Sequence, residues 1–403
     1  MPIAKGVNKR VAYKKETTWG TLAGATGATQ LRRVTADFNL NKEAYESNEI
    51  RTDYQIADFR HGVRSAQGAL NGELSPGSYA DFFAAVVAKD FVAGATATGL
   101  SVTIAASGSL FTVTRATGSF LTDGFEIGNI VRLSGGTLDT NTVGNNLLIV
   151  GITALALTVR VLNGSTLVPQ ASITSVTCTQ VGKETFAPLT GHTDNSFTIE
   201  EWYADIAQSE VYTGMKVTSA AVQLPSTGLT TVDFGFAGKD LTQTGTTAYF
   251  TTPSAAPTTG IFAAVNGAVV VNGTPVAVIT SADFSIERAN ENATVVGSNS
   301  IADMFTGRIR ATGNISVYFE NATFRDYFNA ESTISIVLAL TASSAKDSAA
   351  LSITFPKVKL GSFTKADGEN GIIAQSSFQA LLNDVTTAGL IGSTVSIQDT
   401  TLV

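Results

Sequence analysis

One stretch of the sequence occurs twice, and this repeat limits the possible folds more than any other feature. Residues 56–83 read IADFRHGVRSAQGALNGELSPGSYADFF, and residues 301–328 read IADMFTGRIRATGNISVYFENATFRDYF. The two align without a gap and share eight identical positions, where average residue usage gives roughly two by chance. Overlooking a repeat leads to a wrong fold assignment for the whole chain. We interpret the chain as one domain present twice. The alternative is two unrelated units that look alike because the chain is rich in Ala, Gly, Ser and Thr. The identical positions are Ile56, Ala57, Asp58, Gly62, Ala66, Gly68, Asp81 and Phe83.

Each copy predicts a strand followed by a short helix with an aromatic stripe. The strand alternates, most clearly at Ile315, Val317 and Phe319. Ser75 is a candidate N-cap with Pro76 in the first helical position, and Asn321 is the candidate cap of the second copy. The aromatic residues that we expect to pack each helix on its sheet are Tyr79, Phe82, Phe83, Phe324, Tyr327 and Phe328.

The repeat divides the chain into regions. It extends upstream, because VTADFNL from Val34 resembles ITSADFSI from Ile279. The first copy is interrupted by about ninety residues with their own short strands, which predict an inserted small barrel or sandwich. We therefore expect a mainly β protein, with two β-sandwich domains that each carry one short flanking helix, plus the inserted all-β domain. The expected regions are an N-terminal arm (1–30), domain 1 (31–92 plus 184–245), the insert (93–183), a linker (246–260) and domain 2 (261–403).

Composition excludes several classes of protein. Charged residues make up 15% of the chain and the net charge is −7, which argues against a surface that grips nucleic acid. No apolar run is long enough to cross a bilayer, and the basic start lacks the apolar segment of a signal peptide. Cys178 is the single cysteine, which excludes an internal disulfide and fits folding in a cytoplasm. Residues 1–30 are basic at first and then rich in Gly, Ala and Thr, which predicts a solvated terminus.

The sequence contains no recognisable catalytic, cofactor or metal motif. The two histidines, His61 and His192, lie in no metal-pair or triad spacing, and there is no HExxH, CxxC, GxSxG or P-loop. Glu200 and Glu201 are adjacent in an expected strand and therefore point to opposite faces, which is unsuitable for a carboxylate dyad. We expect no enzyme activity, no cofactor and no bound metal.

Two stretches resemble known proteins. KGVNKRVAYKKETTWGT from Lys5 and GIIAQSSFQALL from Gly371, with the order strand, polar loop, strand, helix and strand pair, resemble the phage tail tube (major tail) proteins. The resemblance covers both halves but not the insert. It implies a virion protein whose β-sandwich and helix occur six times in a ring, in a stacked hollow tube for DNA. Because each chain carries two copies, three chains would close a ring. The implied partners are further copies and the tape measure, tail terminator and baseplate-end proteins, with no specific DNA binding and no membrane.

The resemblance also assigns roles to segments. The long polar loops are placed like the family's ring-stacking loop, the arm would reach a neighbouring subunit, and the insert would lie outside the tube. Acidic side chains would keep DNA from adhering to the lumen, although the sequence does not say which of Asp37, Glu43, Asp283 and Glu287 face inward. The stacking candidates are Glu43, Glu46, Glu49, Arg51, Asp53, Tyr54, Glu291, Asn292 and Asn299.

Two alternatives share this β-rich composition. One is another virion component, such as a capsid decoration or fibre protein, which would not need two tube domains. The other is a glycan-binding or catalytic module in the insert. Its few aromatic residues, Phe111, Phe120 and Phe125, are those expected of a core.

Overall fold

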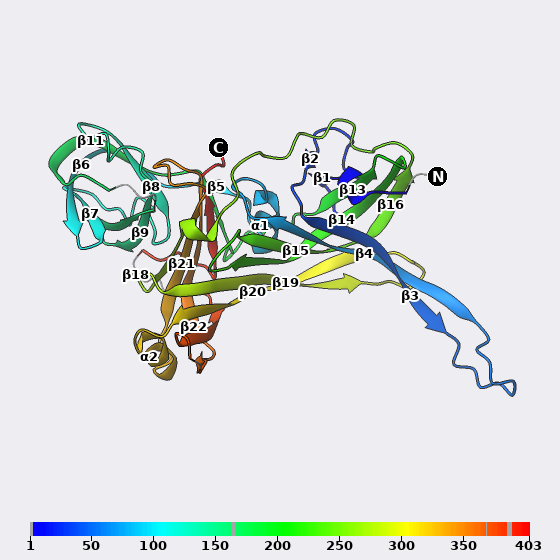
Figure 1. Cartoon of the computed structure of the whole chain (residues 1–403). Coiled ribbons are helices and arrows are strands. Elements are labelled where there is room, and N and C mark those ends of the chain that lie inside the picture. Colours follow the sequence, from blue (N-terminus) through cyan, green and yellow to red (C-terminus); the bar gives the residue numbers. More distant parts are fainter. Residues whose placement is uncertain (1–2, 163–165, 368, 385–388) are drawn as a thin grey trace.

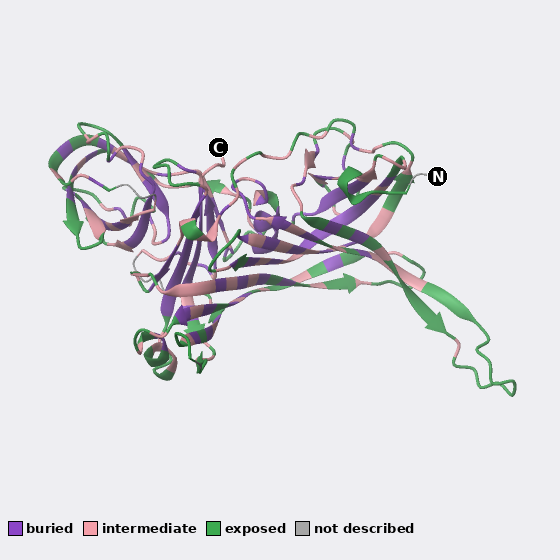
Figure 2. Cartoon of the chain, in the orientation of Figure 1, coloured by how far each residue is buried: buried purple, intermediate pink, exposed green. Residues whose placement is uncertain are grey.

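The computed structural model is mainly β and describes residues 3–162, 166–367, 369–384 and 389–403. A long central sheet passes through both halves of the chain, and each half covers one face of it with a second, shorter sheet (Figure 1). A small barrel lies at one end, and a long hairpin projects at the other. In Figure 2 the buried residues follow the strands between the sheets, while the hairpin is exposed along its length.

In the first half, one long strand belongs to both layers. β14 pairs with β13 and β16 through its first part and with β15 through its second part. Gly214 sits where β14 changes sheets, with φ +67°, and an added Cβ would lie 2.8 Å from the Lys239 side chain. The first cover sheet consists of β1 (Lys9–Lys15), β2 (Thr29–Gln30), β13 (Phe197–Tyr203), the start of β14 (Gln208–Leu224) and β16 (Asp240–Gly245). The central sheet here consists of β3 (Thr35–Glu46), β4 (Phe59–Glu73), β15 (Thr231–Gly238) and the end of β14.

The second half repeats this arrangement. β22 starts in the cover sheet beside β21 and ends in the central sheet beside β24. The second cover sheet consists of β17 (Gly267–Val271), β18 (Thr274–Val276), β21 (Ile334–Thr341), the start of β22 (Ala350–Leu360), β25 (Ser396–Asp399), β12 (Lys183–Phe186) and β5 (Val92–Ala93). The central sheet continues with β19 (Ile279–Ala293), β20 (Asp303–Tyr318), β24 (Ile373–Ala380) and β23 (Thr364–Lys365). Two single 3-10 turns cover Gly6–Asn8 and Ala264–Asn266.

Alternating side chains build one core between the layers. In β15, Val232, Phe234 and Phe236 are buried while their neighbours are partly exposed, as expected for a strand with one covered face. The same cluster contains Val11 of β1 and Phe284 of β19. The core therefore runs without a break from the first half into the second.

Helix α1 (Ala80–Val87) fills the first sandwich, whereas α2 (Thr323–Asn329) lies at its surface. Phe82 is fully buried, with its ring centroid 5.4 Å from that of Phe234. In α2 only Phe324 is buried. The expected N-cap at Ser75 is wrong. Ser75 bonds the Ser78 hydroxyl in a preceding turn, and the helix begins at Ala80.

The insert is a closed barrel with its own core. Its strands run in the order β10-β7-β6-β11-β8-β9, which resolves the expected choice between barrel and sandwich. The short stem strands β5 and β12 pair with each other at its base. Strand β6 was not expected from the sequence, because its Ala-, Gly- and Thr-rich composition gives little hydrophobic contrast. The barrel strands are β6 (Thr96–Ser107), β7 (Leu110–Arg115), β8 (Ile130–Gly135), β9 (Leu147–Ile152), β10 (Ala156–Val161) and β11 (Gln170–Gln180).

The barrel is fixed to the second half although it is inserted in the first. Ile130, Leu148 and Val150 form a buried cluster with Val270 and Val337 of the second cover sheet, among others. Besides its stem partner β5, the strand β12 pairs with β25 of the second half. Residues 184–186, which we expected in the first domain, therefore extend the sheet of the second.

The N-terminal residues and the linker are both packed on the first half. The expected solvated terminus is wrong for residues 9–15, which form β1 along the edge of β13 and bury Val11 and Tyr13. In the linker, Phe250 is fully buried, and its N–H donates to Glu200 at 3.1 Å. Buried polar groups explain both contacts. The backbone of β13 needs a partner strand, and the buried Glu200 carboxylate needs hydrogen-bond donors.

Candidate assembly surfaces

The described part of the chain contains no constellation typical of an active site. No group of three or more His, Cys, Asp and Glu side chains in the described residues is placed to hold a metal ion. Within the same residues, neither helix has the length or the apolar character required to span a bilayer. The features that stand out instead are sheet edges, a polar sheet face and a projecting hairpin.

The two halves are joined by strand pairing. Residues 219–224 of β14 pair antiparallel with residues 282–287 of β19, from Ser219 opposite Glu287 to Leu224 opposite Ala282. We call this pairing the seam. It makes the central sheet continuous, in the order β3-β4-β15-β14-β19-β20-β24-β23. The seam thus places one copy of the repeated domain beside the next in a defined register.

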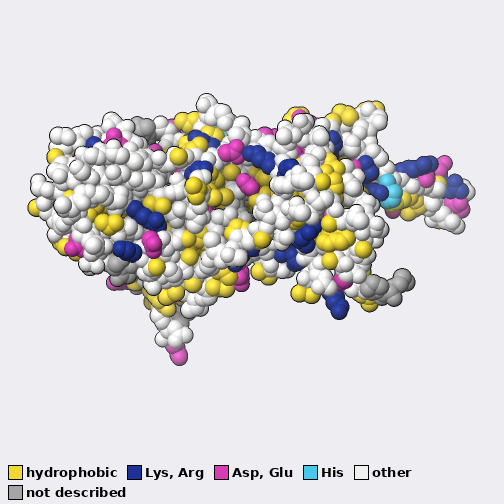
Figure 3. Space-filling model, turned by 90° about the horizontal axis from the view of Figure 1, so that it is seen from above, with side chains coloured by type: hydrophobic (Ala, Val, Ile, Leu, Met, Phe, Trp, Pro, Cys, Tyr) yellow, Lys and Arg dark blue, Asp and Glu magenta, His cyan; other side chains and the backbone are white. Residues whose placement is uncertain are grey.

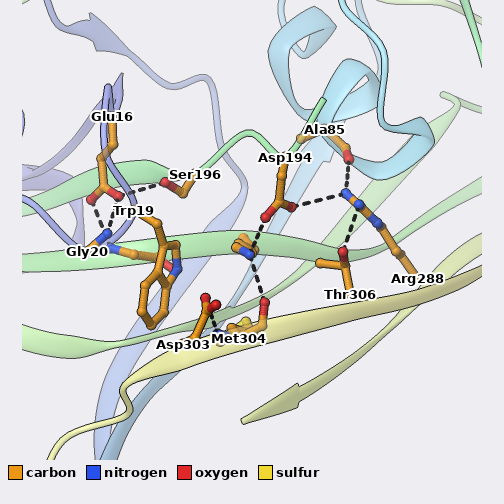
Figure 4. A network of polar contacts seen from close by, with 12 residues as sticks. Glu16, Trp19, Gly20, Ala85, Asp194, Ser196, Arg288, Asp303, Met304 and Thr306 are labelled. Carbon is orange, nitrogen blue, oxygen red and sulfur yellow. Dashed lines mark hydrogen bonds and ion pairs between the residues drawn. The ribbon is translucent and has the colours of Figure 1, made fainter. Parts of the chain in front are cut away.

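A network of polar contacts crosses the seam (Figure 4). Lys216 of β14 places its Nζ atom 2.5 Å from Asp194 Oδ2 and donates to the Met304 carbonyl at 2.9 Å. Arg288 of β19 lies 3.6 Å from Asp194 Oδ1, and its guanidinium donates to the Ala85 carbonyl of α1 at 3.2 Å. The network therefore joins strands of both halves to the first helix.

Burial makes this network costly to leave incomplete. The side chains of Lys216 and Arg288 are 3% and 8% exposed, while that of Asp194 is 48% exposed. Burial lowers the pKa of Arg288, and the nearby Asp194 carboxylate opposes that shift. A buried cation without an acceptor is strongly unfavourable, so the seam depends on Asp194 and on the Ala85 carbonyl.

The central sheet ends in two edges. In the described residues, β3 pairs only with β4 and β23 pairs only with β24. Such edges present unpaired N–H and C=O groups that are ready to bind another strand. The two edges correspond to the two strands that meet at the seam, because β3 corresponds to β19, and the end of β22 with β23 corresponds to the end of β14.

One face of the central sheet is polar. Asp37, Asp283 and Glu287 alternate with the buried Phe38, Phe284 and Ile286 and therefore point away from the core. The carboxylate of Asp283 accepts from Asn314 Nδ2 at 2.9 Å. Arg310 and Gln223 line the same hollow as Asp283. The sequence left open which acidic residues share a face, and these three do, whereas Glu43 lies in the hairpin.

The first stacking candidates all lie in the projecting part of the hairpin that β3 and β4 form (Figures 1 and 2). Arg51 is paired with Asp53 at 2.8 Å, which lowers the pKa of Asp53 by hydrogen bonding. Ile50 and Tyr54 near the tip are 101% and 98% exposed. Exposed apolar residues among charges are typical of a contact surface, and their role in stacking stays a prediction. The exposed candidates are Glu43, Glu46, Glu49, Arg51, Asp53 and Tyr54.

The corresponding loop of the second half is placed differently. Glu291 and Asn292 are exposed, but the Asn299 carbonyl accepts the backbone N–H of Arg64 at 2.8 Å. Ser300 also forms a parallel bridge with Arg64 of β4. This loop therefore lies on the first half of its own chain, and only the first hairpin projects freely.

The charges are distributed unevenly between the two ends of the molecule. Figure 3 shows closely spaced basic and acidic side chains on the projecting hairpin, whereas the barrel end is mostly uncharged. The aromatic residues Phe120 and Phe125 are buried inside the barrel, and Phe111 packs against that core. The barrel surface is thus different in kind from the hairpin.

The expected helix-packing residues lie as follows. Tyr79, Phe82 and Phe83 are buried, while Tyr327 packs at the edge of the core and Phe328 is half-buried beside it. Sequence reasoning missed Asp194, Lys216 and Arg288, because single charged residues in a sequence give no signal of a shared site. A signal does exist in the repeat, since an acidic residue and a lysine recur at matching positions in the second half.

A comparison with models of known protein families shows which family this chain belongs to. Residues 6–380 match the model of the phage tail tube protein family. The chain belongs to this family, and it is a structural protein of a phage tail and hence of the virion. No curated protein sequence matches the chain.

Proposed function

We propose that this tail tube protein assembles into closed rings that stack into a hollow tube for DNA ejection. The observation that carries the proposal is the seam, where one tube domain pairs with the next through the edges of their sheets. Repeating this pairing between chains leaves no edge only if the sheet closes on itself. Since one chain supplies two domains, three chains supply six, and the ring is a homotrimer with pseudo-sixfold symmetry.

The polar face of the central sheet fits the wall of a DNA channel. It carries the three carboxylates of Asp37, Asp283 and Glu287, and among the described residues Arg310 is the single cation that lines the hollow beside Asp283. Negative charge repels phosphates and so keeps DNA from adhering during passage. The opposite face of the sheet is buried under the cover sheets. A ring closed through the sheet edges therefore has the polar face toward the lumen.

The hairpin between β3 and β4 is our candidate for ring stacking. Its length and exposed tip residues Ile50 and Tyr54 let it reach a surface outside its own chain. At the ends of the tube, family membership points to terminator and baseplate-end proteins as partners, with a tape measure protein in the lumen during assembly in the host cytoplasm.

The barrel lies on the outside in this arrangement. It packs on the second cover sheet through Ile130 and Val150, on the side of the core opposite the polar face. A glycan-binding role is less well supported, because Phe120 and Phe125 are buried in the barrel core. A capsid decoration or fibre protein would not need a central sheet that ends in two complementary edges.

Electron microscopy of the purified full-length protein tests the proposal. We expect hollow rings or tubes, with six lobes that repeat strictly at every second lobe, so that the true symmetry is threefold. Six equivalent full chains in a ring would retain the tube and refute the trimer. A protein that remains monomeric at high concentration would refute ring assembly and favour the decoration or fibre alternative.

A further inference from the structure

Half of the network at the seam is present a second time. Asp194 lies three residues before Phe197, which pairs with Met215, and Lys216 follows Met215. In the second half, Glu331 lies three residues before Ile334, which pairs with Val358, and Lys359 follows Val358. Glu331 and Lys359 therefore stand where Asp194 and Lys216 stand.

The second ion pair is longer and more exposed than the first. Lys359 Nζ lies 3.8 Å from Glu331 Oε2, and the two side chains are 46% and 84% exposed. Lys216, by contrast, is 3% exposed and contacts Asp194 at 2.5 Å. In the first half a cation from the adjoining domain, Arg288, completes the site, and in the described residues no such cation contacts Glu331.

The repeat also identifies the residue that corresponds to Arg288. Ala36, Asp37 and Phe38 of β3 match Ala282, Asp283 and Phe284 of β19. Both strands have a register shift at one matching place, between Lys42 and Ala44 in β3 and between Arg288 and Asn290 in β19. Lys42 thus stands in the place of Arg288, and like Arg288 it is a cation.

Among the described residues of its own chain, Lys42 has no acceptor. It is exposed on β3, whose outer edge has no partner strand in the described residues, and it forms no ion pair there. Glu331 and the edge strand β23 lie in the other half of the chain. One chain therefore presents the cation at one end of its central sheet and the matching carboxylate at the other end.

We infer that Lys42 of a second copy of this chain binds Glu331, with β3 of that copy paired antiparallel along residues 362–367. The seam fixes the register. Ser219 opposite Glu287 and Ala221 opposite Ser285 correspond to Ser362 opposite Asn41 and Thr364 opposite Asn39. In this position Lys42 also lies near the carbonyl of Ala330, which matches Ala85. The inference rests on the proposed ring and specifies the contact that closes it.

A charge exchange tests the ion pair. Lys42→Glu or Glu331→Lys each places like charges across the contact, and we expect the concentration needed for ring assembly to rise about tenfold or more, which corresponds to the loss of about 1.4 kcal/mol per contact. The double variant Lys42→Glu/Glu331→Lys restores opposite charges and should recover assembly. Lys42→Arg is the matched control and should assemble like the wild type, because Arg288 performs this role at the seam. A double variant that assembles no better than the single variants would overturn the ion pair.

A disulfide tests the register independently of charge. Asn39→Cys/Thr364→Cys places the two thiols on directly opposite residues, where Cβ atoms lie about 4.5–5.5 Å apart, whereas diagonal pairs lie about 7–8 Å apart. Mild oxidation should link chains of the variant into dimers and trimers on a denaturing gel. Asn39→Cys/Ser362→Cys is the diagonal control and should link far less. The native Cys178 is buried and does not compete.

The outcomes separate this inference from the proposed function. Rings that form normally but show no Asn39–Thr364 cross-link would overturn the inferred contact and leave the tube intact. Cross-linked chains that continue beyond three would support the contact and refute the closed trimer. A wild-type protein that forms no rings, together with an Asn39→Cys/Thr364→Cys variant that forms no cross-links, would overturn both.

Discussion

Arg288 donates a hydrogen bond from Nη1 to the carbonyl oxygen of Ala85 at 3.2 Å, across the boundary between the two halves of the chain. Arg288 is on β19, the strand of the second half that pairs at the seam, and Ala85 is in the helix of the first half. The bond lies in a site where the arginine side chain is 8% exposed. The same contact that joins the halves therefore also sets where the first helix stands relative to the seam.

Replacing Arg288 should weaken the whole fold. Arg288→Met removes the bonds to Ala85 and Thr306 and the ion pair with Asp194, and leaves the Ala85 carbonyl without this donor. We expect a loss of about 2–3 kcal/mol in the free energy of unfolding, measured by denaturant titration. Arg308→Met, at an exposed position of β20, is the control and should cost less than about 0.5 kcal/mol. Equal stability of both variants would show that the network does not hold the halves together.

Phe82 is the aromatic residue on which the first sandwich depends most. It is fully buried, and its ring contacts those of Tyr13, Phe197, Phe234 and Phe236. Phe82→Ala should therefore cost about 3–5 kcal/mol, from lost burial and from the cavity left behind. Thermal unfolding measures the effect. Phe305→Ala, at a residue that is 60% exposed, is the matched control, and a similar loss there would contradict the assignment of the core.

Glu126 predicts a pH dependence of stability. Burial, and to a smaller extent the nearby Glu184 carboxylate, raise its pKa from 4.5 to about 8. Between these two values the folded state binds more protons than the unfolded state, so stability falls as the pH rises through this window. Glu126→Gln removes this contribution and should raise the melting temperature at pH 9, by on the order of a few degrees, with little change at pH 4.

Melting curves from pH 4 to pH 9 measure this effect. Burial also raises the pKa of Glu184, so part of the slope should remain in the variant. Glu49→Gln, at an exposed hairpin position, is the control and should leave the slope unchanged. A Glu126→Gln slope equal to that of the wild type would show that this carboxyl group is not the source.

The sequence predicts the repeated architecture well, because the two copies of the repeat align without a gap and keep several identical residues at the same spacing. The matched Ala-Asp-Phe triplets at Ala36 and Ala282 do occupy matching strands. The barrel strand Leu147–Ile152 is visible as an apolar run, whereas β6 is hidden by its weak hydrophobic contrast.

What the sequence could not predict are contacts between distant segments. Residues 9–15 read as a polar terminus, and only the open edge of β13 explains why they are a strand. The attachment of the barrel to the second half likewise depends on Ile130 and Val337. In the sequence these two residues look like ordinary core residues, and nothing there indicates that they contact each other's domain. The network of Asp194, Lys216 and Arg288 joins three separate segments, and its existence follows from tertiary structure alone.

The barrel cannot be removed without consequence, although its ends lie close together. The stem strands pair at its base, with Ala93 opposite Lys183, so a short glycine linker in place of residues 94–182 closes the gap. The deletion, however, uncovers Val270 and Val337 of the second cover sheet. It also removes the partners of the Gln398 amide group, which bonds the N–H of Ile130 at 2.7 Å.

We therefore expect the deletion variant to aggregate and to unfold at a lower temperature, because a contiguous apolar patch is exposed and a buried amide loses its partners. Light scattering against concentration measures the first effect and calorimetry the second. The same deletion with Val270→Thr and Val337→Thr should scatter less while remaining destabilised, since the patch becomes more polar but Gln398 stays unpartnered. A simple deletion that stays monodisperse and melts like the wild type would mean that the barrel only rests on the second half, and that the buried cluster between them contributes little to the fold.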